Sequence, residues 1–154
     1  MSPSQHHRPQ RPTSLAGYLD AMSRPVFSTG MSWRVVDAKW DGTREAFEGF
    51  EPERVAAMTD ADVERLVQDT RIIRNRKKIE ATIDNAQAML DLDREYGGFE
   101  KYLSSRVGFE ETVAALCRDF RFLGPSGAYF FLWGVAQPVP SHEEWSGTHG
   151  RRKA

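Results

Sequence analysis

The chain has 154 residues, 40% of them hydrophobic and 28% charged, with a formal net charge of -1 at pH 7. These values are typical of a globular domain with a hydrophobic core, and the longest apolar run, Ala128 to Trp133, is too short to cross a membrane. A single cysteine, Cys117, excludes an internal disulfide, and the N-terminus lacks a secretory-type apolar core, so we expect a cytoplasmic protein with no membrane partner.

The two ends of the chain differ in composition from the rest. Residues 1–13 contain no aliphatic residue after the initiator methionine, and residues 146–154 are polar and basic. Such segments cannot bury enough apolar surface to fold by themselves. We therefore expect a disordered N-terminal arm (1–13), one helical domain (14–145) and a disordered basic tail (146–154).

Capping residues and prolines divide the first part of the domain into short helices. Ser14 is placed to cap a first helix, which Pro25 should bend or restart because proline lacks an amide donor. Ser32 is placed to cap a second helix, from Trp33 to Trp40. The turn-forming pair Asp41-Gly42 should end that second helix.

The longest helix is predicted from about Ile73 to Tyr96. Four apolar residues recur at steps of four, three and four, which places them on one buried face: Ile79, Ile83, Ala86 and Leu90. Gly97-Gly98 should end this helix, because glycine readily adopts the left-handed conformation found at helix ends.

The last long segment, Ala128 to Val135, is apolar on all sides, so it should form a central buried helix after the break at Gly124-Pro125-Ser126-Gly127. No segment alternates convincingly between apolar and polar residues as a strand does. The sequence therefore predicts an all-α fold, a multi-helix single domain.

A dense cationic cluster lies at the head of the longest predicted helix. Five of the eight residues from 71 to 78 are basic: Arg71, Arg74, Arg76, Lys77 and Lys78. Because the whole chain is nearly neutral, such a cluster suggests a local anionic partner, and phosphate binds readily at the start of a helix. The alternative is a solvated basic face without a ligand.

Several segments resemble one known family. Residues 54–58, 62–69 and 72–79 closely resemble the DNA-3-methyladenine glycosylase I family of helix-hairpin-helix base-excision enzymes. Gly30-Met31-Ser32-Trp33 resembles the Gly-Leu-Ser-Trp segment of that family, and residues 120–126 (Phe-Arg-Phe-Leu-Gly-Pro-Ser) resemble its Phe-Lys-Phe-Val-Gly-Thr-Ser segment. The resemblance covers roughly residues 26–137 and implies the helix-hairpin-helix glycosylase fold.

The resemblance also implies roles for particular residues. It places a flipped base against Trp33, since such an enzyme holds its target base between planar groups, and the structural alternative is that Trp33 belongs to the core. The base-binding residues implied are Trp33, Ser32, Ser126 and Tyr129. The DNA-binding residues implied are Arg71, Arg74, Asn75, Arg76, Lys77 and Lys78, although successive helix residues point in different directions, so two or three of the cations should face DNA.

Two family features have no counterpart in this sequence. The family has a glutamate eight residues before the pocket tryptophan, and here that position is Pro25. Asp37, one helical turn after Trp33, is the only substitute we identify, so the catalytic residue is unknown. The segments that bind zinc in the family are missing, so we expect no metal and no cofactor, with Trp145 anchoring the C-terminal end by packing.

The hairpin departs from the family as well. Thr70-Arg71 stands where the family tends to have Ala-Gly, and a glycine there would allow the backbone to approach a phosphate closely. We expect Arg71 to compensate through its charge.

The implied function is hydrolysis of the N-glycosidic bond of alkylated purines after base flipping, as part of DNA repair. The implied partner is double-stranded DNA with a damaged base, and we expect a monomer. Two alternatives remain open at this point. One is an inactive or altered relative that binds damaged DNA, and the other is a protein that binds a small planar base-like ligand.

Overall fold

The computed structural model describes residues 8–149, with their side chains up to residue 145, and all regular structure in this part of the chain is helical. The predicted all-α fold is therefore confirmed. The elements are α1 (Leu15–Ser28), α2 (Trp33–Ala38), α3 (Trp40–Ala46), the 3-10 turn η1 (Glu48–Phe50), α4 (Pro52–Ala56), α5 (Asp60–Leu66), α6 (Arg76–Tyr96), α7 (Phe99–Leu103), α8 (Phe109–Asp119), α9 (Pro125–Gly134) and α10 (His142–His149).

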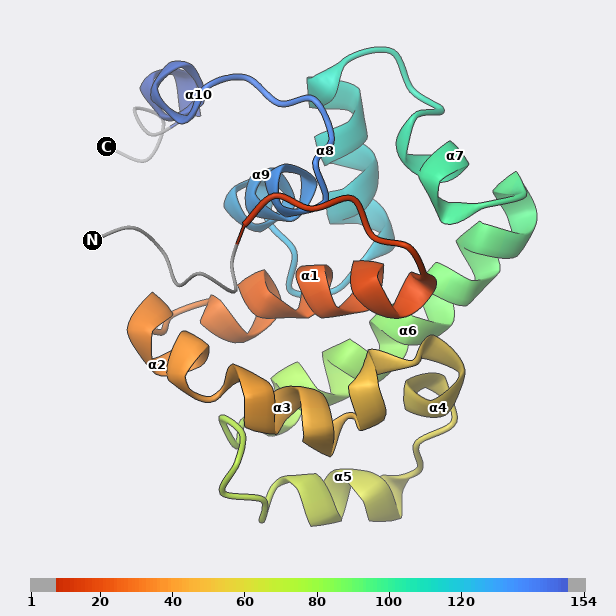
Figure 1. Ribbon diagram of the computed structural model, residues 1–154, viewed down its shortest axis with the longest axis vertical. Coiled ribbons are helices and arrows are strands. Elements are labelled where there is room, and N and C mark those ends of the chain that lie inside the picture. Colours follow the sequence, from red (N-terminus) through yellow and green to blue (C-terminus); the bar gives the residue numbers. More distant parts are fainter. Residues whose placement is uncertain (1–7, 150–154) are drawn as a thin grey trace.

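Helix α1 crosses the middle of the molecule, with α8, α9 and α10 on one side of it and α2 to α5 on the other (Figure 1). It packs against both α6 and α9. Leu19, Met22 and Val26 of α1 are completely buried, and so is Phe131 of the facing helix α9. The core therefore forms where these three helices meet, and α1 carries its central stripe.

Pro25 lies inside α1 without ending or restarting it. The helix continues through this proline to Ser28, so the predicted restart is wrong. Pro25 is buried against α9, where a Cβ atom added to Gly127 would lie 3.4 Å from the Cβ of Pro25. This close packing of α1 on α9 offsets the backbone hydrogen bond that the proline cannot donate.

The segment predicted as one helix from Trp33 to Trp40 is two helices. Helix α2 ends at Ala38 and α3 begins at Trp40, so the turn expected at Asp41-Gly42 is instead part of α3. Trp40 explains the difference: it is buried, and its Nε1 donates to Asp20 of α1 at 2.9 Å. Anchoring this large side chain in the core overrides the local turn preference of the next two residues.

Helix α6 begins at Arg76 rather than at Ile73 as predicted, because the Asn75 side chain caps it by accepting from the Lys78 amide. It ends at Gly97, whose φ of 72° is the left-handed conformation expected there. Of the predicted apolar stripe, Ile79, Ile83 and Ala86 are buried and Leu90 is half-buried.

The hairpin between α5 and α6 is seated on α3 at a glycine. A Cβ atom added to Gly42 would lie 2.9 Å from the Cβ of Arg71 and 3.1 Å from its carbonyl oxygen. Lys39 reinforces this contact, since its Nζ donates to the Thr70 carbonyl at 2.9 Å. The hairpin is therefore held at a fixed place against α2 and α3.

Both ends of the described chain lie against the helices. Residues 8–13, part of the predicted disordered arm, run along α1, and the Gln10 amide donates to the Gly134 carbonyl at 3.0 Å. Helix α10 runs into the predicted tail, and Trp145 is buried against Tyr129, with 4.8 Å between the ring centroids, as expected of an anchor. Residues 1–7 and 150–154 of the predicted arm and tail lie outside the described residues.

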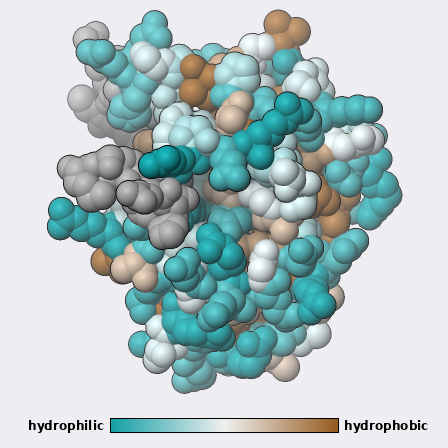
Figure 2. All heavy atoms as spheres, viewed as in Figure 1, coloured by the Kyte–Doolittle hydropathy of each residue, from teal (hydrophilic) through white to brown (hydrophobic). Residues whose placement is uncertain are grey.

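The face of the molecule in Figure 2 is mostly hydrophilic, with hydrophobic residues showing as small separate patches. Within residues 8–149, no helix combines the length and the apolar character needed to cross a membrane.

We predict that Gly42→Ala destabilises the protein by about 1–3 kcal/mol, because the added methyl group has no space beside the Arg71 backbone. Chemical denaturation of the purified variant measures the change. Gly134→Ala is the matched control, since a Cβ atom there meets nothing within 4 Å and alanine is favourable in a helix. Equal stability of the two variants would refute the close approach of the hairpin.

Candidate functional site

A cavity of about 300 Å³ opens where the end of α1, the start of α2 and the start of α9 meet. Its walls are mainly aromatic and proline rings with a few hydroxyl groups. The lining residues are Pro25, Ser28, Thr29, Trp33, Phe122, Gly124, Pro125, Ser126, Gly127 and Phe130. A concave, mostly apolar site with a few polar groups is typical of a pocket for a planar organic ligand. We call this cavity the aromatic pocket.

Trp33 forms one wall of the aromatic pocket. It is the first residue of α2, and 38% of its surface is exposed, so the indole is not sealed within the core. Its ring meets the Phe130 ring edge to face, with 5.9 Å between the centroids. Trp33 therefore lies where the sequence prediction placed it, at a cavity wall, and its contact with a base stays a prediction.

Of the other three predicted base-binding residues, one lines the aromatic pocket and two do not. Ser126 lines the aromatic pocket, whereas Ser32 is exposed and caps α2 by accepting from the Arg34 amide at 3.1 Å. Tyr129 is buried, and its hydroxyl donates to the Pro140 carbonyl at 2.9 Å. The predicted role of Tyr129 in the pocket is therefore corrected, because its side chain packs toward α10.

Among residues 8–145, whose side chains the structure describes, no carboxylate lines the aromatic pocket, and Pro25 occupies part of its wall. Asp37, the weak catalytic candidate, accepts a hydrogen bond from Nη1 of Arg24 at 3.0 Å instead. Arg24 is itself buried, with 4% of its surface exposed, and its guanidinium lies 5.1 Å from the centre of the Trp40 ring. Asp37 therefore forms an ion pair with Arg24 of α1 and is not part of the pocket.

The sequence prediction missed two aromatic walls, Phe122 and Phe130. Phe130 follows Ser126 by four residues, and that helical spacing was the available signal for a shared face. Phe122 is 38% exposed and has a φ of 58°, a left-handed conformation that costs a residue with a side chain about 1–2 kcal/mol. Such strain is often found at functional sites. No local sequence pattern predicted this conformation of Phe122.

The cations of the hairpin between α5 and α6 are not equivalent. Arg71 is held by Asp69, with 2.7 Å between Nη2 of Arg71 and the carboxylate, and its side-chain hydrogen bonds keep the pKa of Asp69 below its usual value. Arg76 pairs with Glu64 at 2.7 Å. Arg74 and Lys77 are exposed and make no side-chain hydrogen bond or ion pair with any other described residue. Arg74 and Lys77 are therefore the hairpin cations best placed to meet an outside anion.

The structure corrects the prediction that Lys78 binds DNA, because this side chain is buried. Only 4% of its surface is exposed, and its Nζ donates to the carbonyls of Phe27 at 2.9 Å and Thr29 at 2.5 Å. Burial lowers the pKa of this ammonium below its usual value. Lys78 therefore joins the start of α6 to the end of α1, where Ser28 and Thr29 line the aromatic pocket.

Asn75 also has a structural task, because its Oδ1 caps α6. Its predicted contact with DNA therefore has to use the amide nitrogen of the side chain.

Cys117 is half-buried, and burial raises the pKa of its thiol. Residues 8–149 contain no group of three or more His, Cys, Asp or Glu side chains placed to hold a metal ion.

Comparison with known proteins points to one family. A family model described as methyladenine glycosylase matches residues 19–121. The chain is 44% identical over 124 residues to DNA-3-methyladenine glycosylase 1 of Escherichia coli K12, an alignment that covers 67% of this chain and 66% of that protein. It is 36% identical over 84 residues to DNA-3-methyladenine glycosylase of Haemophilus influenzae, covering 54% and 45%. The chain thus spans less than two thirds of the length of these two relatives.

A solved structure supports the same family. The 3-methyladenine DNA glycosylase I of Staphylococcus aureus, studied for its recognition of 3-methyladenine, superposes with a TM-score of 0.74 at 30% sequence identity. The match covers 84% of this chain and 80% of that one. The resemblance seen in the sequence is confirmed.

We predict that Lys78→Met destabilises the protein by about 1–3 kcal/mol, because two carbonyl groups at the end of α1 lose their charged donor. Lys77→Met, one residue earlier and exposed, should change the stability by less than about 0.5 kcal/mol. If the hairpin binds DNA as the sequence predicts, the salt dependence of that binding separates the two lysines, since loss of a phosphate contact reduces its slope by about one. That reduction is expected for Lys77→Met alone, and finding it for Lys78→Met would overturn the buried placement.

Proposed function

The chain belongs to the methyladenine glycosylase family, and we propose that it is a DNA glycosylase that releases alkylated purines from duplex DNA. The observation that carries the proposal is the position of Trp33, at the wall of a cavity of about 300 Å³ formed in part by the end of α1. Lys78 joins that end of α1 to the cationic hairpin. The proposal includes a monomeric protein that acts in the cytoplasm.

In the binding step, Arg74 and Lys77 contact phosphates of the duplex. Such contacts position a protein on DNA but carry no sequence information. The damaged nucleotide then rotates out of the duplex, which costs a few kcal/mol and costs least where damage has already weakened the stack. Stacking of the base on Trp33, worth about 1–3 kcal/mol, offsets that cost. Phe130 stabilises the orientation of the indole through its edge-to-face contact.

The chemistry of an alkylated purine suits a pocket without a carboxylate. In the cleavage step, the oxygen of a water molecule adds to C1′ of the sugar and the C1′–N bond breaks. The electron pair of that bond leaves with the base, and a proton of the water passes to solvent. A purine made cationic by alkylation leaves as a neutral molecule, so no general acid has to protonate it.

The aromatic walls supply the recognition that a carboxylate would otherwise provide. The faces of aromatic rings carry partial negative charge and attract cations, by about 0.5–2 kcal/mol depending on how fully the site excludes water. Trp33, Phe122 and Phe130 all line the pocket. A cationic base is therefore favoured over the corresponding neutral purine, although by less than a buried carboxylate would achieve.

We predict that Trp33→Ala lowers the rate of base release from methylated DNA by about ten- to a hundredfold, because the stacking energy of the flipped base is lost. Release of the free base by purified protein is the measurement. Trp33→Phe is the matched control and should retain most of the activity, since it keeps a planar ring. If the unaltered protein releases no base above background at high concentration, it is not a glycosylase, and a non-catalytic DNA-binding role remains.

We also predict that Arg74→Glu combined with Lys77→Glu weakens binding to duplex DNA by more than about tenfold at low salt, because two phosphate contacts become repulsive. Arg94→Glu combined with Lys101→Glu is the control with the same change of net charge, placed at the far end of α6 from the hairpin and on α7. Fluorescence anisotropy with labelled duplex measures both variants. Equal loss in both would mean that net charge, and not the hairpin, governs binding.

A further inference from the structure

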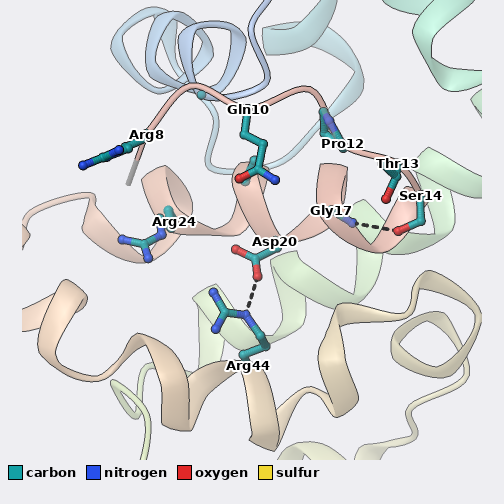
Figure 3. Close-up of a pocket in the computed structure, with 11 residues that line it drawn as sticks. Arg8, Gln10, Pro12, Thr13, Ser14, Gly17, Asp20, Arg24 and Arg44 are labelled. Atoms are coloured by element: carbon teal, nitrogen blue, oxygen red, sulfur yellow. Dashed lines mark hydrogen bonds and ion pairs between the residues drawn. The ribbon is translucent and has the colours of Figure 1, made fainter. Parts of the chain in front are cut away.

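A second hollow lies beside α1, apart from the aromatic pocket. It has a volume of about 260 Å³ and lies between the extended residues 8–13 and the side of α1 that carries Gly17, Asp20 and Arg24 (Figure 3). Figure 3 shows Gln10 reaching from the extended segment toward Asp20, and Arg44 reaching from α3 to the same carboxylate. Neither the base pocket nor the hairpin uses the side chains of this hollow.

The hollow carries an excess of positive charge. Three arginines line it, Arg8, Arg24 and Arg44, against one carboxylate, Asp20. Arg44 neutralises that carboxylate, because its Nε donates to Asp20 at 2.7 Å. Arg8 makes no side-chain hydrogen bond or ion pair with any other residue that the structure describes. Arg24 pairs with Asp37, which does not line the hollow, so among the described residues Arg8 is the arginine of this hollow without a carboxylate partner.

The guanidinium of Arg24 has a fixed orientation in this hollow. It is 4% exposed, its Nη1 donates to Asp37 at 3.0 Å, and its guanidinium packs over the Trp40 ring. These contacts fix the orientation of the group, while a guanidinium has five N–H donors and this hydrogen bond uses one. A rigid, largely desolvated arginine binds an oxyanion more strongly than a mobile surface lysine does.

The hollow and the aromatic pocket are neighbours on one face of α1. Asp20, Arg24 and Ser28 follow one another at steps of four residues, and Ser28 lines the aromatic pocket while the other two line the hollow. The rise from Arg24 to Ser28 is about 6 Å along the helix axis. The extended segment runs opposite to α1, so Arg8 lies at the end of the hollow that is nearer the aromatic pocket (Figure 3).

We propose that this hollow binds a phosphate group, and that its source is the phosphodiester next to the nucleotide that enters the aromatic pocket. The second part rests on the proposed function. A phosphate group fits better than a carboxylate, because its tetrahedral oxygens can accept from Arg8 and Arg24 on different sides. Gln10, between these two arginines and the start of α1 in Figure 3, supplies a further donor in the same hollow.

The test compares Arg8→Gln with Arg11→Gln. Arg11 lies three residues along the same extended segment but pairs with Glu100 and does not line the hollow, so it is a matched control. Removing Arg8 is not expected to unfold the protein, since its side chain has no partner among the described residues. The probes are inorganic phosphate, monitored by backbone amide NMR shifts, and a labelled DNA duplex, monitored by anisotropy over a range of salt concentrations.

For the unaltered protein and Arg11→Gln, phosphate should shift the amide signals of the non-proline residues among 8–14 and of residues 17–24. For Arg8→Gln the apparent phosphate affinity should fall by about tenfold, and the salt slope of DNA binding should fall by about one. If Arg8→Gln matches Arg11→Gln in both measurements, the phosphate site is refuted, whether or not base release is observed.

The two proposals fail in different ways. If phosphate binding depends on Arg8 while the unaltered protein neither binds DNA nor releases a base, the hollow binds free phosphate and the proposed function is wrong. If phosphate binding depends on Arg8 but the DNA salt slope does not, the hollow is a phosphate site that lies off the path of the strand, and the assignment to a phosphodiester is overturned.

Discussion

The contact on which the site depends is the pair of hydrogen bonds from the buried Lys78 ammonium to the carbonyls of Phe27 and Thr29. A buried ammonium is costly unless its donors are satisfied, so these carbonyls hold it strongly in place. They belong to residues 51 and 49 positions away in the chain. This contact fixes the start of α6, which follows the cationic hairpin, beside the wall of the aromatic pocket. The proposed transfer of a nucleotide from duplex to pocket needs these two parts at a fixed separation.

Ion pairs divide the cations of the described residues into two groups, and the division matters most at the hairpin. Arg71, Arg76 and Arg24 each have a carboxylate partner, at distances of 2.7, 2.7 and 3.0 Å. Arg74 and Lys77 do not, and they project from the hairpin. In the proposed function a DNA phosphate competes with these carboxylates for Arg71 or Arg76, since exposed ion pairs are weak and easily exchanged. In that proposal Arg74 and Lys77 make the first contact with DNA, because no ion pair has to be broken first.

Much of the helical framework was predictable because helix boundaries are local. Ser14 caps α1 as expected, and Gly97 ends α6, because each acts on backbone groups within a few residues. The errors occurred where distant packing overrides such local preferences. Pro25 stays inside α1 because α9 packs against it, and Asp41-Gly42 stays inside α3 because Trp40 is anchored to Asp20. Neither partner is visible in the neighbouring sequence.

In the candidate site, too, some features follow from the local sequence and others depend on distant packing. The sequence by itself determined that the chain is a helical domain of this family, that a cationic hairpin opens its longest helix, and that Trp33 and Ser126 belong to segments of the pocket. Tertiary structure alone decided that Lys78 is buried, that Tyr129 packs on Trp145, that Asp37 pairs with Arg24, and that residues 8–13 close a hollow over α1. The reason is physical: a sequence pattern specifies which face of a helix a residue occupies, but the free energy of a side chain depends on partners brought to it from remote parts of the chain.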